Sequence, residues 1–188
     1  RVTLQNGIAD TLTVVTSGSG SHGVFLQSVG GGGGQGGSVT EAASNSTTSA
    51  QLGGLASSVS GAGGGGGQGG VVTLSMGNLR IGTSGDNARG LFAQSVGGGG
   101  GSAGNSTNNV QGGDVGLSVA IGGSGGSGGD GNTVSITTRD GLISTSGSSA
   151  SAMFIQSVGG GGGDATSFVD GTASSTLSLN GTIGGSGG

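Results

Sequence analysis

The chain has 188 residues, of which 54 are Gly, and it contains no Pro, Cys, Trp or Tyr. Charged residues make up 6% of the sequence, Lys is absent, and the formal net charge is −4. This composition excludes collagen, which needs Pro and a Gly at every third position, and it disfavours nucleic-acid binding, which needs a basic surface to neutralise phosphates.

Short segments in which apolar and polar residues alternate recur along the chain, and Gly, Asn, Asp or Ser separates them. This period of two, with turn residues between the segments, predicts β-strands. No stretch has the apolar spacing of a helix, and each Gly would destabilise a helix by ~1 kcal/mol. The sequence therefore predicts an all-β fold. In chain order, the clearest strand segments are 72–76, 79–83, 115–121, 134–136 and 177–179.

One motif occurs three times in the sequence. Gly-Val-Phe-Leu-Gln-Ser-Val-Gly at 23–30 returns as Gly-Leu-Phe-Ala-Gln-Ser-Val-Gly at 90–97 and as Ala-Met-Phe-Ile-Gln-Ser-Val-Gly at 152–159. Thr-Ser-Gly precedes each copy, and each copy leads into a run of five Gly. A second glycine block alternates with the first and occupies 61–70, 122–129 and 184–188.

The chain is therefore interpreted as a single repetitive segment over residues 1–188, with repeats that cover roughly 1–70, 71–132 and 133–188. The sequence opens at Arg1 without an initiator Met and stops inside a motif that is already present upstream. We therefore expect an excerpt of a longer chain, with any export signal or anchor outside it. The absence of Cys is compatible with passage through an oxidising compartment.

One repeat has too few apolar residues to form a core alone, but stacked repeats can share one. This favours a parallel β-helix, or β-solenoid, in which each strand pairs with its equivalent one coil away. At ~3.3 Å per residue, three short strands and their turns need roughly 20 to 30 residues, so we expect two or three coils per repeat. The rival interpretation is a disordered Gly/Ser-rich chain, which gives no reason for Phe and Gln to keep a fixed register.

The recurring strand has two different faces. Leu91, Ala93 and Ser95 share the face that varies between copies but stays largely apolar, which is typical of a core. The other face keeps the same three residue types in every copy and predicts a structural ladder. Its members are Phe25, Gln27, Val29, Phe92, Gln94, Val96, Phe154, Gln156 and Val158.

A strand that is apolar on both faces is usually covered on both. One hypothesis is that the polyglycine segments are ordered, polyproline-II-like, and cover the ladder face, because residues without Cβ can approach closely. The alternative is that the glycines form flexible loops. The sequence leaves both open.

Catalytic chemistry has no visible support. His22 is the only His, and the aligned positions hold Arg89 and Ser151, so this slot is interpreted as a tolerant turn. The acidic residues do not recur in pairs, and no Lys follows the glycine runs as a phosphate loop requires. The segment 125–130 fits the start of a calcium-binding nonapeptide, which makes Asp130 a Ca²⁺ candidate, although Asn132 stands where a large apolar residue is needed. We predict no enzyme activity and no cofactor.

The segment 90–101 resembles the Gly-Ile-x-Ala-Gln-Ser-Ile-(Gly)n repeats of large autotransporter-type surface proteins of Gram-negative bacteria, and 81–89 fits the same repeat. The resemblance covers nearly the whole chain. It implies a β-helical passenger region outside the outer membrane, often associated with adhesion or biofilm, and it supplies no catalytic residues.

These observations predict a structural repeat segment of a long extracellular or surface-displayed fibre that self-associates or assembles into filaments. The alternative is a ligand- or glycan-binding surface module of an adhesin, with a cell surface or a glycan as its partner. The outer membrane would be reached only through parts of the chain outside this sequence.

Overall fold

The computed structural model describes residues 1–44, 52–111, 115–166, 168–173 and 177–188. Over these residues the regular elements are β-strands, and the sheets are parallel, so the predicted all-β class is confirmed. No helix in the described part of the chain is long and apolar enough to cross a membrane. The strands are β1 (Val2–Gln5), β2 (Thr11–Thr16), β3 (Val24–Val29), β4 (Val39–Ser44), β5 (Leu52–Val59), β6 (Val72–Thr83), β7 (Leu91–Val96), β8 (Ser106–Gln111), β9 (Val115–Ile121), β10 (Val134–Thr145), β11 (Met153–Val158), β12 (Phe168–Ala173) and β13 (Leu177–Ile183).

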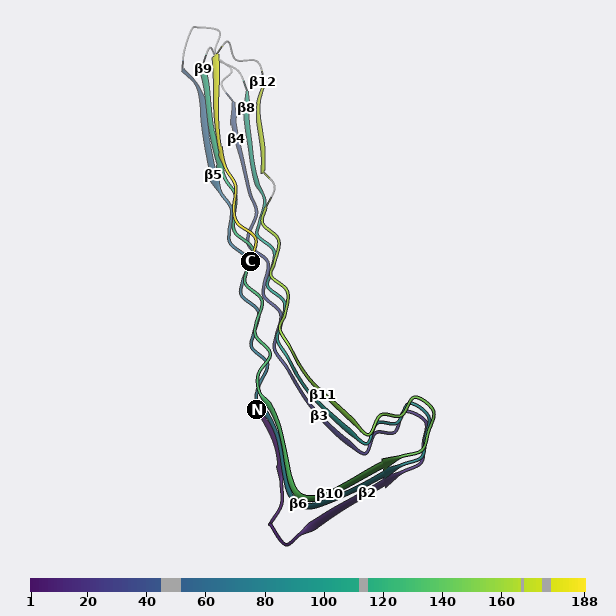
Figure 1. Ribbon diagram of the computed structural model, residues 1–188. Helices are drawn as coiled ribbons and strands as arrows, with labels where there is room; N and C mark the ends of the chain where they lie inside the picture. Colours follow the sequence, from purple (N-terminus) through teal and green to yellow (C-terminus); the bar gives the residue numbers. More distant parts are fainter. Residues whose placement is uncertain (45–51, 112–114, 167, 174–176) are drawn as a thin grey trace. The chain divides into compact units, whose positions relative to one another are not determined.

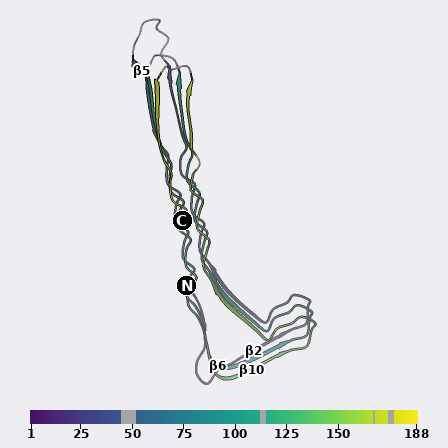
Figure 2. The ribbon, with the colours of Figure 1, turned by 45° about the horizontal axis from the view of Figure 1, so that its top comes forward.

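The chain packs as two compact units, and every repeat contributes one segment to each of them. The first unit comprises 1–31, 68–98 and 129–160, and the second comprises 32–67, 99–128 and 161–188. Within each unit, three strands of different colour run side by side, one from each repeat (Figures 1 and 2).

Each sheet pairs a strand with its equivalent in the neighbouring repeat. Phe25 pairs with Phe92, and Phe92 pairs with Phe154. The first two strands are 67 residues apart in the sequence and the next two are 62 residues apart, as the neighbouring Gln27–Gln94 and Gln94–Gln156 hydrogen bonds also show. The described strands pair only at intervals of a whole repeat. The expectation of two or three coils per repeat is therefore wrong. The reason is that much of each repeat is not strand, because its glycine segments form ordered backbone of their own.

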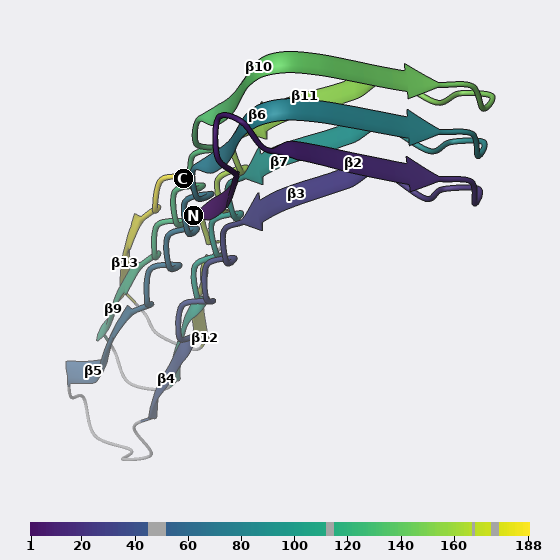
Figure 3. The same ribbon diagram turned by 90° about the horizontal axis from the view of Figure 1, so that it is seen from below.

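The first unit has a continuous apolar core between two sheets. One sheet contains β1 and β2 beside β6 and β10, and the other has the order β11-β7-β3 (Figure 3). The middle repeat supplies the most buried side chains because it has a neighbour on both sides. Val72, Leu74 and Leu91 are fully buried, and their period of two places them on the inner faces.

The second unit contains the sheets β12-β8-β4 and β13-β9-β5. Apart from Val110, its buried strand residues are small or polar, as with Ala56, Ser58 and Ser106. Leu55 and Leu179 are 67% and 66% exposed. The hydroxyls of Ser58 and Ser106 share a hydrogen bond in this interior. Apolar burial of large side chains therefore stabilises the first unit more than the second.

The recurring Thr-Ser-Gly begins a tight turn in each repeat of the first unit. The Thr hydroxyl donates a hydrogen bond to the carbonyl oxygen five residues later, from Thr83 to Ala88 at 3.1 Å and from Thr145 to Ala150 at 3.0 Å. The turn holds one position in the left-handed region, which is occupied by Gly20, Asn87 and Ser149 with φ of 69°, 56° and 54°. Of these three residue types, only Gly adopts this conformation without steric cost.

Ser149→Gly is expected to raise the free energy of unfolding by about 0.5–1 kcal/mol, because Gly removes the strain of a left-handed Ser. Urea unfolding followed by circular dichroism measures the change. Ser148→Gly, one residue earlier and without positive φ, is the matched control and should lower the stability. Equal effects of the two substitutions would contradict the assigned turn.

Candidate functional site

The structure brings the nine ladder residues together as three rows on the outer face of the β11-β7-β3 sheet. The rings of Phe25 and Phe92 stack with centroids 4.6 Å apart, and those of Phe92 and Phe154 stack at 5.0 Å. Beside them, Gln27 Nε2 donates to Gln94 Oε1, and Gln94 Nε2 donates to Gln156 Oε1, both at 2.7 Å. The third row pairs Val29, Val96 and Val158 in the same register.

The hypothesis that polyglycine covers this face is wrong. Phe25 is 52% exposed and Val29 is 62% exposed. The ladder does not need a cover, because neighbouring rings shield one another's faces and each amide finds its partner in the adjacent repeat. The glycine segments instead bond to other glycine segments.

Two residues of the turn slot contact the Phe row. The His22 ring is nearly parallel to Phe25 and Phe92, with centroids 5.9 Å from each, and its Nδ1 accepts the backbone N–H of Arg89 at 2.9 Å. The Arg89 guanidinium carbon lies 4.7 Å from the Phe154 centroid, within cation–π range. Sequence reasoning treated this slot as a tolerant surface and missed its contacts. In every repeat this slot lies close to the Phe in the sequence, and that proximity could have predicted the contacts.

Gln94→Met is expected to cost about 1–2 kcal/mol of unfolding free energy, because it removes two side-chain hydrogen bonds and keeps the length of the side chain. Gln27→Met removes one such bond and should cost about half as much. Thermal unfolding of both variants provides the comparison. Equal costs, or none, would contradict a continuous amide ladder.

The glycine segments of the second unit form two hydrogen-bonded layers. One layer contains the runs that follow the Phe motif, and the other contains the second glycine blocks. Along a layer, Gly33 N–H donates to Gly99 O at 2.7 Å and Gly100 N–H donates to Gly161 O at 2.8 Å. Each bond joins a Gly to the residue that precedes its equivalent in the next repeat.

A second set of bonds joins the two layers, whose segments run in opposite directions. Gly64 N–H donates to Gly34 O at 2.7 Å, Gly101 N–H to Gly64 O at 2.8 Å, Gly126 N–H to Gly101 O at 2.8 Å and Gly163 N–H to Gly126 O at 2.7 Å. Successive bonds of each set are three residues apart, which matches the three residues per turn of a polyproline-II segment. The polyglycine is therefore ordered.

This geometry requires Gly at two of every three positions. A Cβ on Gly100 would overlap the carbonyl oxygen of Gly126, and a Cβ on Gly101 would overlap that of Gly34. The third position points outward: a Cβ on Gly99 would find its nearest neighbour, Gly161 O, at an ordinary 3.7 Å.

Most other residues within the glycine segments of the second unit occupy the outward positions. Ala103, Ala165 and Thr166 are exceptions near the segment ends, and the methyl of Ala103 faces the Cα of Gly123. Sequence reasoning missed this Gly-Gly-x rule, although the spacing of three residues between the substituted positions signals it. The outward residues of the second unit are Gln35, Ser38, Ala62, Ser102, Asn105, Ser124, Ser127, Asp164 and Ser186.

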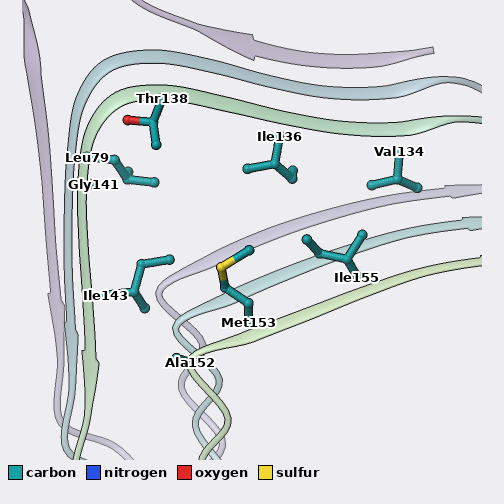
Figure 4. Close-up of a pocket in the computed structure, with 9 residues that line it drawn as sticks. All are labelled: Leu79, Val134, Ile136, Thr138, Gly141, Ile143, Ala152, Met153 and Ile155. Atoms are coloured by element: carbon teal, nitrogen blue, oxygen red, sulfur yellow. The ribbon is translucent and has the colours of Figure 1, made fainter.

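An apolar groove of about 550 Å³ lies in the third repeat of the first unit. Val134 and Ile136 from β10 face Met153 and Ile155 from β11 across it (Figure 4). Leu79 and Gly141 line the same groove. No charged side chain lines it, so its surface suits an apolar partner.

Asp130, the Ca²⁺ candidate, is exposed at the end of its glycine segment, where its backbone carbonyl accepts Gly69 N–H at 2.8 Å. Among the described residues, no three His, Cys, Asp or Glu side chains gather as a metal site would need. The fit of Asp130 to a calcium repeat therefore gains no support from its neighbours.

Searches of protein-family models, curated proteins and solved structures found no match to this chain.

Proposed function

We propose that this chain is a structural segment of a long extracellular or surface-displayed fibre, built as a β-solenoid in which one repeat makes one coil. The observation that carries the proposal is the register. Strands and glycine segments alike bond to their equivalents in the next repeat. Such a lattice has no intrinsic limit on the number of repeats, so the length of the fibre increases with each repeat that is added.

The sequence itself supports the proposed location. The segment 90–101 resembles repeats of autotransporter-type surface proteins of Gram-negative bacteria, whose passenger regions lie outside the outer membrane. Low charge and the absence of Cys are compatible with export followed by folding outside the cell. Adhesion, biofilm or filament assembly would then depend on the rigidity of the fibre.

An insertion series tests the proposal. Extra copies of residues 71–132 are placed after residue 132, where Thr133 is equivalent to Val71. Each copy is expected to lengthen the particle by about 4.8 Å at constant cross-section, as measured by cryo-electron microscopy. An insert that carries Ala at Gly100 and Gly101 is the matched control and should not extend the lattice. Separate globules joined like beads would contradict the proposal.

Glycan binding is the competing function, and the 52% exposure of Phe25 at the open side of the Phe row is the feature that favours it. Sugars stack on the faces of aromatic rings. Here the two faces of Phe92 are already covered by Phe25 and Phe154, and Phe92 is only 8% exposed. A glycan array separates the functions: saturable binding that Phe25→Ala abolishes would favour the adhesin module over the fibre.

A further inference from the structure

The large apolar side chains of β9 point out of the second unit, whereas its small residues form the interior. Ser118 and Ala120 are fully buried between the two sheets of the unit. The alternating residues Val115 and Leu117 are 39% and 37% exposed. The β13-β9-β5 sheet, whose strands lie side by side in Figure 3, therefore has an apolar outer face.

The exposure of this face does not come from the ends of the chain. β9 is the middle strand of its sheet, and Leu117 pairs with Leu55 on one side and with Leu179 on the other. Leu91 of the first unit also has a neighbour on both sides, but it is fully buried because a second sheet covers it. Further repeats before or after these three would lengthen the outer face without covering it.

The apolar face recurs in every repeat, and its described outward positions hold no charged residue. Two of its rows consist of large apolar side chains: Leu55, Leu117 and Leu179 in one, and Val59, Ile121 and Ile183 in the other. The opposite sheet of the unit differs, since β8 has Thr107, Asn109 and Gln111 at its outward positions. A contiguous apolar face that grows with each repeat is typical of a protein–protein contact, whereas single exposed Leu residues are not.

We propose that the outer face of the β13-β9-β5 sheet pairs with the same face of a second copy of this chain, so that two fibres lie side by side. This inference rests on the proposed solenoid. A second copy repeats its rows at the same ~4.8 Å spacing, so the contact can continue along the whole length, as it does between the paired sheets of steric zippers. A partner without this period would cover only part of the face. Because both copies use the same surface, the contact closes after two fibres.

The area of the face determines how many repeats stable pairing needs. The seven residues of β9, at ~3.3 Å each, and a strand spacing of ~4.8 Å give each repeat roughly 110 Å² of face. A stable interface buries about 800 Å² on each partner, which corresponds to about seven repeats. The three repeats of this chain present roughly 330 Å² and should pair only weakly. Longer chains of the same repeat should pair stably.

Lengthened chains test this inference. A chain with about six extra copies of residues 71–132 exceeds the required area. At micromolar concentration it is expected to sediment with twice the mass of one chain, and cryo-electron microscopy should show two fibres in contact, whereas the chain without inserts sediments as a monomer. Long fibres that stay single, or bundles of more than two, would overturn the inference and leave the solenoid intact. Beads in place of fibres would instead contradict the solenoid.

Variants of the inserted copies test which face is used. Leu117→Thr in every inserted copy is expected to weaken pairing by at least about 100-fold, because each inserted repeat loses an apolar side chain from the contact. Asn109→Thr is the matched control, since it places the same residue on the polar outer face of the opposite sheet, and it should leave pairing unchanged. If the Leu117→Thr chain fails to fold, Val115→Thr changes the same face with a side chain of similar shape. Equal effects on the two faces, or single fibres that bind phosphatidylcholine vesicles instead, would overturn the pairing.

Discussion

Gly100→Ala is expected to lower the free energy of unfolding of the second unit by at least about 3 kcal/mol, because the new methyl group has no space between the two glycine layers. Its Cβ would overlap Gly126 O and lie 2.7 Å from Gly163 N. Neither atom can move without breaking the hydrogen bond that joins Gly163 N–H to Gly126 O. Chemical denaturation of the purified chain, followed by circular dichroism, measures the loss.

Gly99→Ala is the control for the same chemical change one residue away. Its Cβ points outward, and the nearest atom is 3.7 Å away. Stability should stay within about 0.5 kcal/mol of wild type or rise slightly, because Ala restricts the unfolded chain. Similar costs at Gly99 and Gly100 would mean that the glycine segments are not layered as described.

Leu91→Ala is expected to cost about 3 kcal/mol, because it leaves a cavity in the only large apolar core of the described residues. Leu91 is fully buried between Val24 and Met153, its partners in the adjacent strands. Met153→Ala makes a comparable truncation in the same row, but Met153 is 48% exposed, so the cost should be about 1 kcal/mol. A reversed order of the two costs, measured by urea unfolding, would contradict the placement of the third repeat at one side of the core.

The faces of the recurring strand could be predicted from the sequence, because a strand has a fixed period of two. Leu91, Ala93 and Ser95 are buried as that pattern predicts. The identical residue types at Phe25, Phe92 and Phe154 also indicated a shared register, which the sheet pairing shows. Repetition made both inferences possible, since one copy alone would not have distinguished a ladder from chance.

The coil length could not be predicted from strand lengths. The prediction of roughly 20 to 30 residues per coil treated the coil as strands joined by turns. Segments such as 97–104 and 122–129 are instead extended backbone without strand pairing. Polyglycine has no side-chain pattern from which its neighbours can be read. Substituted positions three residues apart, such as Ser124, Ser127 and Asp130, were the trace of its geometry in the sequence.

The fibre proposal depends most on the glycine layers being ordered and hydrogen-bonded. Amide hydrogen exchange measured at each residue tests this directly. Gly100 and Gly101 donate to Gly161 and Gly64, so their amides are expected to exchange slowly, whereas the outward amide of Gly99 exchanges quickly. The same alternation of one fast and two slow amides should continue at Ser124, Gly125 and Gly126. Uniformly fast exchange through both segments would contradict the account.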